Sequence, residues 1–196
     1  MAGICIPECV TALTPFSTIN VCNLTTSLRS GEIAKLVFFK CNSVVTDVTS
    51  DTEWGTLFSS GNAIKTLVGR GTISEKSSDG VIRLGCQDVA TISKYPFTYE
   101  SELVDATLAT DASIYNDLNN AKLNLTVAFL TCDGWLIINP DYTTGTNIGL
   151  KLDALNISPV YSGEANSKTK YVINGALSED AILKPIKLTS AVLALL

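Results

Sequence analysis

The chain has 196 residues, with 19 acidic and 14 basic side chains and no histidine. Without histidine the usual general base and the commonest metal ligand are missing, so a catalytic site would depend on carboxylates, lysine, tyrosine, serine or cysteine. Charged residues make up only 17% of the chain, and a net charge of −5 without a cluster of lysine or arginine argues against specific nucleic-acid binding.

The first thirty residues show no helical or strand periodicity, although they contain apolar side chains together with Pro7 and Pro15. This pattern predicts an extended arm over residues 1–30 that needs a surface to pack against. The first strand is predicted over residues 33–40, where β-branched and aromatic residues are dense.

A short helix is predicted next, because Ser50 and Glu53 have the spacing of a capping box, in which each side chain bonds the other residue's backbone N–H. Trp54, Leu57 and Phe58 then fall at positions i, i+3 and i+4 and form one apolar face.

The middle of the chain is predicted to form strands. Gly61 ends the helix, since glycine tolerates a left-handed backbone. A polar segment at residues 75–80 predicts a turn, and Tyr95, Phe97 and Tyr99 alternate with polar residues as in a half-buried strand. The strands are predicted over residues 63–74, 81–84 and 95–103.

A second helix is predicted over residues 112–122, with Asp111 as its N-cap. A β-hairpin follows, because Asp133-Gly134 between two apolar runs is typical of a type I′ turn, in which both central residues have positive φ. The hairpin strands are predicted over residues 123–131 and 135–139, and two further strands over residues 150–160 and 169–177.

These elements predict a mainly β protein: a β-sandwich or barrel of six to eight strands with two short helices and extended terminal arms. The expected organisation is an arm over residues 1–30, one β-rich domain over residues 31–188 and an apolar tail over residues 189–196.

Cysteines are concentrated near the start of the chain, where Cys5, Cys9, Cys22 and Cys41 could supply four thiolates to a structural zinc ion. Disulfides within the arm are an alternative. The absence of a basic secretory signal predicts synthesis in a cytoplasm, and reduced, buried cysteines fit that compartment best. No cofactor is predicted.

No pattern of residues predicts a catalytic site, and we expect the protein not to be an enzyme. Gly69-Arg70-Gly71 lacks the third glycine and the following helix of a dinucleotide loop. Glu100 and Glu102 share one face of a predicted strand, but nothing else converges on them, so a solvated or interfacial face is the better interpretation.

The hydrophobic share of 46% and the low charge predict that other copies of the chain cover part of its surface. An ordinary soluble domain rich in serine and threonine is the alternative. No apolar run approaches the roughly 20 residues that span a bilayer, so no membrane partner is expected. Interface segments are predicted at residues 1–16, 71–80 and 191–196, with Ile4, Ile6, Phe16, Leu193, Leu195 and Leu196 as the contacting side chains.

The order of these elements, an arm, a strand-rich body and an amphipathic helix before a hairpin, resembles the tube-forming proteins of phage tails and related injection machines. The likeness covers about residues 33–177. The stretches at residues 33–41, 46–54 and 129–135 also look like virion structural proteins from phages of Bacteroidetes-type hosts.

The resemblance implies a self-assembling virion subunit, made in a bacterial host cytoplasm, that forms the stacked rings of a tail tube. Its partners would be copies of itself and other virion proteins, and DNA would pass through an acidic lumen without specific binding. Two alternatives remain: a capsid auxiliary or decoration protein, and a non-viral β-sandwich binding module that uses Trp54, Trp135 or Tyr99 to stack a sugar.

Overall fold

The computed structural model of the chain describes residues 32–74, 77–84, 87–101, 104–105, 109–121, 124–141, 144–161, 168–178 and 181–196. Within these residues the protein is mainly β, as predicted. The strands are β1 (Ile33–Lys40), β2 (Val44–Val45), β3 (Ala63–Lys65), β4 (Gly69–Ile73), β5 (Ser77–Leu84), β6 (Gln87–Ser101), β7 (Val104–Asp105), β8 (Leu125–Thr131), β9 (Trp135–Asp141), β10 (Thr146–Ile148), β11 (Leu150–Tyr161), β12 (Lys168–Leu177) and β13 (Lys184–Lys187). The helices are α1 (Asp51–Ser59), α2 (Ala109–Asn120) and α3 (Ser190–Leu195).

Six antiparallel strands close into a barrel in the order β1, β4, β6, β12, β11 and β8, with β8 pairing back onto β1. The barrel prediction is therefore confirmed. Inside the barrel lies the first core, which includes Phe38, Phe97, Tyr99 and Phe129, and residues of α2 pack against the same cluster. The rings of Phe97 and Phe129 meet edge to face, with 5.1 Å between their centroids.

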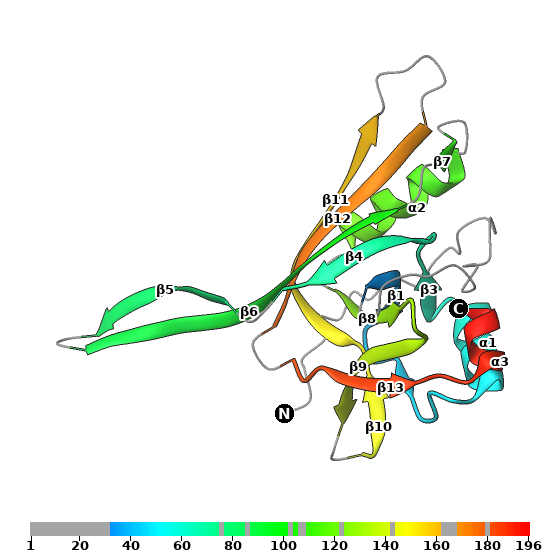
Figure 1. Cartoon of the computed structure of the whole chain (residues 1–196), viewed down its shortest axis with the longest axis horizontal. Coiled ribbons are helices and arrows are strands. Elements are labelled where there is room, and N and C mark those ends of the chain that lie inside the picture. The colour runs from blue at the N-terminus through cyan, green and yellow to red at the C-terminus, as the bar shows by residue number, and fades with distance from the viewer. Residues whose placement is uncertain are drawn as a thin grey trace.

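A second core lies outside the barrel wall formed by β1 and β8. Strand β9 branches from β8 and pairs with both β10 and β13. Helices α1 and α3 lie side by side next to these strands (Figure 1). Trp54, Leu136 and Val192 from these elements are buried in the second core.

Strand β1 is buried on both faces because it separates the two cores. Leu36 and Phe38 belong to the first core, whereas Val37 and Phe39 belong to the second. Strand β8 alternates in the same way between Val127 and Ala128. A wall shared by two cores accommodates many apolar side chains and few charges, so the double core by itself explains much of the composition that suggested covering by other copies.

Local capping explains where α1 begins and ends. The Ser50 hydroxyl accepts a hydrogen bond from the Glu53 N–H, as predicted. The reciprocal bond of a capping box is not made, because the Glu53 carboxylate instead accepts from the backbone N–H groups of Thr46 and Asp47. Gly61 has φ of 68°, which fits its predicted role after the helix.

Two turn predictions are wrong. Residues 77–80 form the start of β5 rather than a turn, and β6 begins at Gln87, well before the predicted strand. The β8–β9 hairpin exists, but its loop has three residues and only Gly134 has positive φ. Asp133 therefore does not occupy a type I′ position, and the geometry is that of a type I turn closed by a left-handed glycine.

The helix predictions also need correction. Helix α2 begins at Ala109, so Asp111 lies inside the helix and is not its N-cap. The predicted tail at residues 189–196 is not an extended arm. It forms α3, a third helix capped by the Thr189 hydroxyl.

Candidate assembly surfaces

The β5–β6 ribbon is the part of the described structure with the least support from the rest of the chain. Strand β5 pairs with residues 87–94 of β6, and among the described residues neither of these segments pairs with a third strand. The ribbon extends away from the barrel (Figure 1). Eight residues at about 3.3 Å each make it about 26 Å long. An isolated two-stranded ribbon is marginally stable in water.

The register of the ribbon sets which residues lie opposite one another. Val81 is opposite Ala90 and Ile82 is opposite Val89. The outer edge of β5 leaves backbone groups that can pair with another chain. The predicted interface at residues 71–80 overlaps only the start of this ribbon.

Among the described side chains, the exposed large apolar ones lie on several different elements. Trp135 is 41% exposed and the Lys187 amine lies 5.4 Å from the centroid of its ring. Among the described side chains, the other large apolar ones that are exposed are Val44, Val160, Ile182 and Leu195.

The C-terminal helix closes the second core. Leu196 is 2% exposed and Val192 is fully buried, so these side chains pack within their own chain. Leu193 is partly buried against the same core, and only Leu195 of the three predicted contact residues is exposed. The structure thus places Leu196 where it cannot contact another copy unless α3 moves.

Two lysines bond the carbonyl groups at the end of α3. Lys35 is a buried residue of β1, and its amine donates to the Leu196 carbonyl with an N–O distance of 2.5 Å. Lys65 of β3 donates to the Leu195 carbonyl, and its amine lies 5.7 Å from the centroid of the Phe58 ring. Burial lowers the pKa of Lys65. Cations at the C-terminal end of a helix are stabilising, so these lysines hold α3 in place.

The predicted arm lies outside the described residues, and with it lie Ile4, Ile6 and Phe16. Cys5, Cys9 and Cys22 also lie outside them. Cys41 is buried and disulfide-bonded, so its sulfur is not available as a thiolate ligand in the zinc alternative. The expectation of buried, reduced cysteines holds for Cys132 and fails for Cys41.

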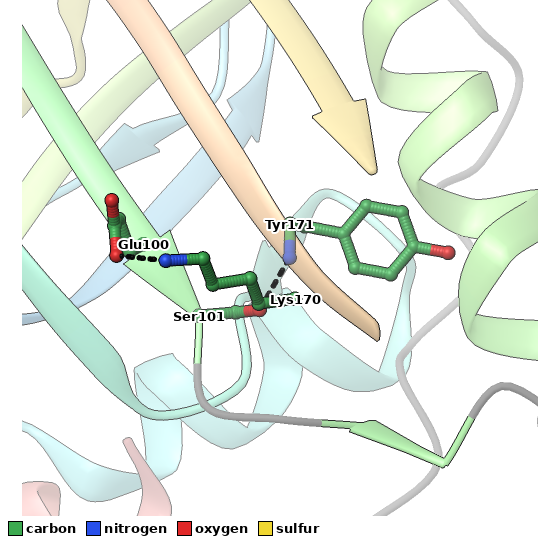
Figure 2. A network of polar contacts seen from close by, with 4 residues as sticks. All are labelled: Glu100, Ser101, Lys170 and Tyr171. Atoms are coloured by element: carbon green, nitrogen blue, oxygen red, sulfur yellow. Dashed lines mark hydrogen bonds and ion pairs between the residues drawn. The ribbon is translucent and has the colours of Figure 1, made fainter. Parts of the chain in front are cut away.

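Glu100 lies in an ion pair on the outer face of the barrel. Its carboxylate is 2.7 Å from the Lys170 amine of β12, and beside it the Ser101 hydroxyl accepts a hydrogen bond of 2.9 Å from the Tyr171 N–H (Figure 2). Figure 2 also shows the Tyr171 ring directed toward α2, where it stacks on Tyr115 with 4.0 Å between centroids.

Glu102 lies outside the described residues. Within the part of the chain that the structure describes, no group of three or more metal-binding side chains converges.

The Gly69-Arg70-Gly71 segment has a packing role in β4. A Cβ atom at position 69 would lie 2.2 Å from the Glu100 carbonyl oxygen and 2.7 Å from the Tyr99 ring. The Tyr99 hydroxyl donates to the Ala34 carbonyl at 3.1 Å inside the barrel.

Tyr99 and Trp54 are both fully buried, so neither can stack a sugar. Of the three aromatic residues predicted to stack a sugar, only Trp135 is exposed.

No described helix is both long and apolar enough to cross a bilayer. No protein-family model matches the chain, and no curated protein is significantly similar to it. The function must therefore be argued from the fold and its surfaces.

Proposed function

We propose that this chain is a self-assembling virion structural subunit that forms the stacked rings of a phage tail tube. The observation that carries the proposal is the β5–β6 ribbon, which leaves the barrel without packing against a third strand among the described residues. The barrel body has two cores of its own, whereas the ribbon needs a surface supplied by another molecule.

A ribbon that projects from one side and docks on a different surface of the next copy makes a head-to-tail contact. Such contacts generate closed rings when the rotation between copies closes, and helical filaments when it does not. Docking would also cover the outer edge of β5, which otherwise invites uncontrolled pairing. Rings that stack through terminal segments would form a tube, as the resemblance of the sequence to tube-forming proteins implies.

The partners in this proposal are copies of the chain and other virion proteins, with synthesis in a bacterial cytoplasm. The disulfide at Cys41 is compatible with this history, because a finished particle leaves the reducing compartment. A capsid decoration protein would use the same body and ribbon on a preformed shell. A sugar-binding module would depend on Trp135.

Light scattering and negative-stain electron microscopy of the purified chain test the proposal. We expect rings or tubes that form in the absence of any shell as the protein concentration rises. A monodisperse monomer at every concentration and salt level would overturn the proposal. Binding only to preformed capsids would favour the decoration protein, and a change of Trp135 fluorescence on adding sugars would favour the binding module.

A ribbon-deleted variant identifies the segment responsible. Residues 78–93 are replaced by Asn-Gly, which joins Ser77 to Lys94 through a two-residue turn. The variant should remain folded, with an unfolding temperature close to that of the intact chain, and should no longer assemble. Assembly of the ribbon-deleted variant would show that the ribbon is not the segment that joins the subunits.

A further inference from the structure

One wall of the barrel carries a row of uncharged polar residues that continues across four strands. Thr72 of β4 is paired with Thr98 of β6, Thr98 with Asn174 of β12, and Asn174 with Asn156 of β11. All four residues are exposed. Their neighbours along the strands, such as Phe97 and Ile173, are buried in the first core, so the row lies on the outer face.

Hydrogen bonds within this face tie some of its side chains together. The hydroxyl oxygens of Thr72 and Thr98 are 3.2 Å apart, and the Asn156 amide donates to the Ser158 hydroxyl at 3.3 Å. Side chains held in this way present hydroxyl and amide groups at the regular spacing of the strands.

The charges nearest the row are paired. Glu100 is 2.7 Å from Lys170, and the Arg70 guanidinium lies 3.9 Å from the Glu32 carboxylate. Neither cation therefore stands alone to hold a phosphate, and neither carboxylate makes the row strongly acidic. Among the described side chains of these four strands, Val160 near the end of β11 is the only large apolar one that is exposed.

The position of the row in the barrel separates it from the helices. In the closed order of strands, β12 is opposite β1 and β6 is opposite β8. Helices α1 and α3 cover the second core outside β1 and β8. A ring subunit must turn one side to the axis and the opposite side outward, so the helix side and the row cannot both face the axis.

We infer that the outer face of β6 and β12, with Thr98 and Asn174 at its centre and Thr72 and Asn156 at its flanks, lines the bore of the assembled ring. This inference rests on the proposed function. The row itself fits a passing duplex polyanion, because its hydroxyl and amide groups include no cation to hold phosphates and no apolar patch to hold bases. It replaces the acidic lumen expected from the net charge of the chain.

Cysteine labelling of assembled tubes tests the assignment. Asn174→Cys places a thiol in the row, and Ser59→Cys places one on the exposed surface of α1 as a matched control. N-ethylmaleimide should react at both positions, as read by peptide mapping. Gold particles that carry maleimide and are wider than a subunit should decorate the walls of S59C tubes only. Wild-type tubes, with the six native cysteines, set the background.

Gold along the walls of N174C tubes would overturn the assignment, since it would place the row outside. An introduced thiol in N174C that reacts with N-ethylmaleimide in dissociated subunits but not in tubes would also overturn it, because the row would then be a subunit interface. Failure of the wild-type chain to assemble is a different result, which overturns the proposed function and this assignment with it.

Discussion

The barrel body and the β5–β6 ribbon are built from the same kind of antiparallel pairing but differ in what supports them. In the body, β1 and β8 are buried on both faces by two cores of the same chain. In the ribbon, β5 is paired along one edge only among the described residues. If the proposed function holds, stability and assembly are separated along this chain. Substitutions in the body should change folding, and substitutions in the ribbon should change association.

The largest effect on stability is expected at the centre of the barrel. Phe129 is fully buried and packs edge-on against Phe97, so Phe129→Ala should lower the free energy of unfolding by about 3–5 kcal/mol in urea titrations. The ribbon-deleted variant is the comparison, and the free energy of unfolding of its monomer should stay close to that of the intact chain. Equal losses in the two variants would show that the ribbon belongs to the cooperative core.

A pair of glycine variants sharpens the comparison within the body. Gly69→Ala should destabilise the monomer by roughly 1–3 kcal/mol, because its Cβ would meet the Glu100 backbone at 2.2 Å. Gly55 lies inside α1, and an added methyl group there would meet nothing within 4 Å, so Gly55→Ala should stabilise by about 0.5–1 kcal/mol. Thermal unfolding of both variants checks the opposite signs.

The hydrogen bond from Lys35 to the end of α3 should contribute a similar amount to the free energy of unfolding. Lys35→Met keeps an unbranched side chain but removes the donor to the Leu196 carbonyl, which should cost roughly 1–3 kcal/mol and increase proteolysis near α3. Lys184→Met, at an exposed position of β13, is the control for the loss of one positive charge. An unchanged rate of cleavage in K35M would mean that apolar packing alone holds the helix.

The smallest effect concerns the loop before α1. Hydrogen bonds from the Thr49 hydroxyl and backbone N–H hold the pKa of the Asp47 carboxyl below its ordinary value of 3.8. Because the folded state favours the ionised form, this contribution is complete above pH 3.8 and is lost as the pH falls through the lowered value. A carboxyl NMR titration should show the low pKa, and Thr49→Ala should move it back toward 3.8.

Local sequence patterns predicted the elements that a few neighbouring residues are enough to specify. The dense run of β1 and the Ser50 cap of α1 are of this kind. The predicted strand at residues 81–84 is confirmed as the second half of β5, but its first half was missed because Asp79 and Gly80 are typical turn residues. The apolar run at the end of the chain predicted an interface, but a sequence alone does not show whether Leu196 is buried by its own core or by a neighbour.

The candidate assembly surfaces could be predicted only in part, because the sequence alone does not show which distant segments come together. Low charge pointed to covering by other copies, whereas two cores in one chain account for much of it. The row of Thr72, Thr98, Asn174 and Asn156 is spread over four strands and becomes visible only through their registers. No local spacing could have brought these residues together.

Hydrogen exchange of the β5 amides, compared between dilute monomer and assembled rings, tests the central claim that the ribbon is completed by another copy. In an antiparallel pair about half of the β5 amides point away from β6. These amides should exchange rapidly in the monomer and become protected on assembly, while amides of β1 and β8 stay protected in both states. Equal exchange of β5 in monomer and rings would contradict the account.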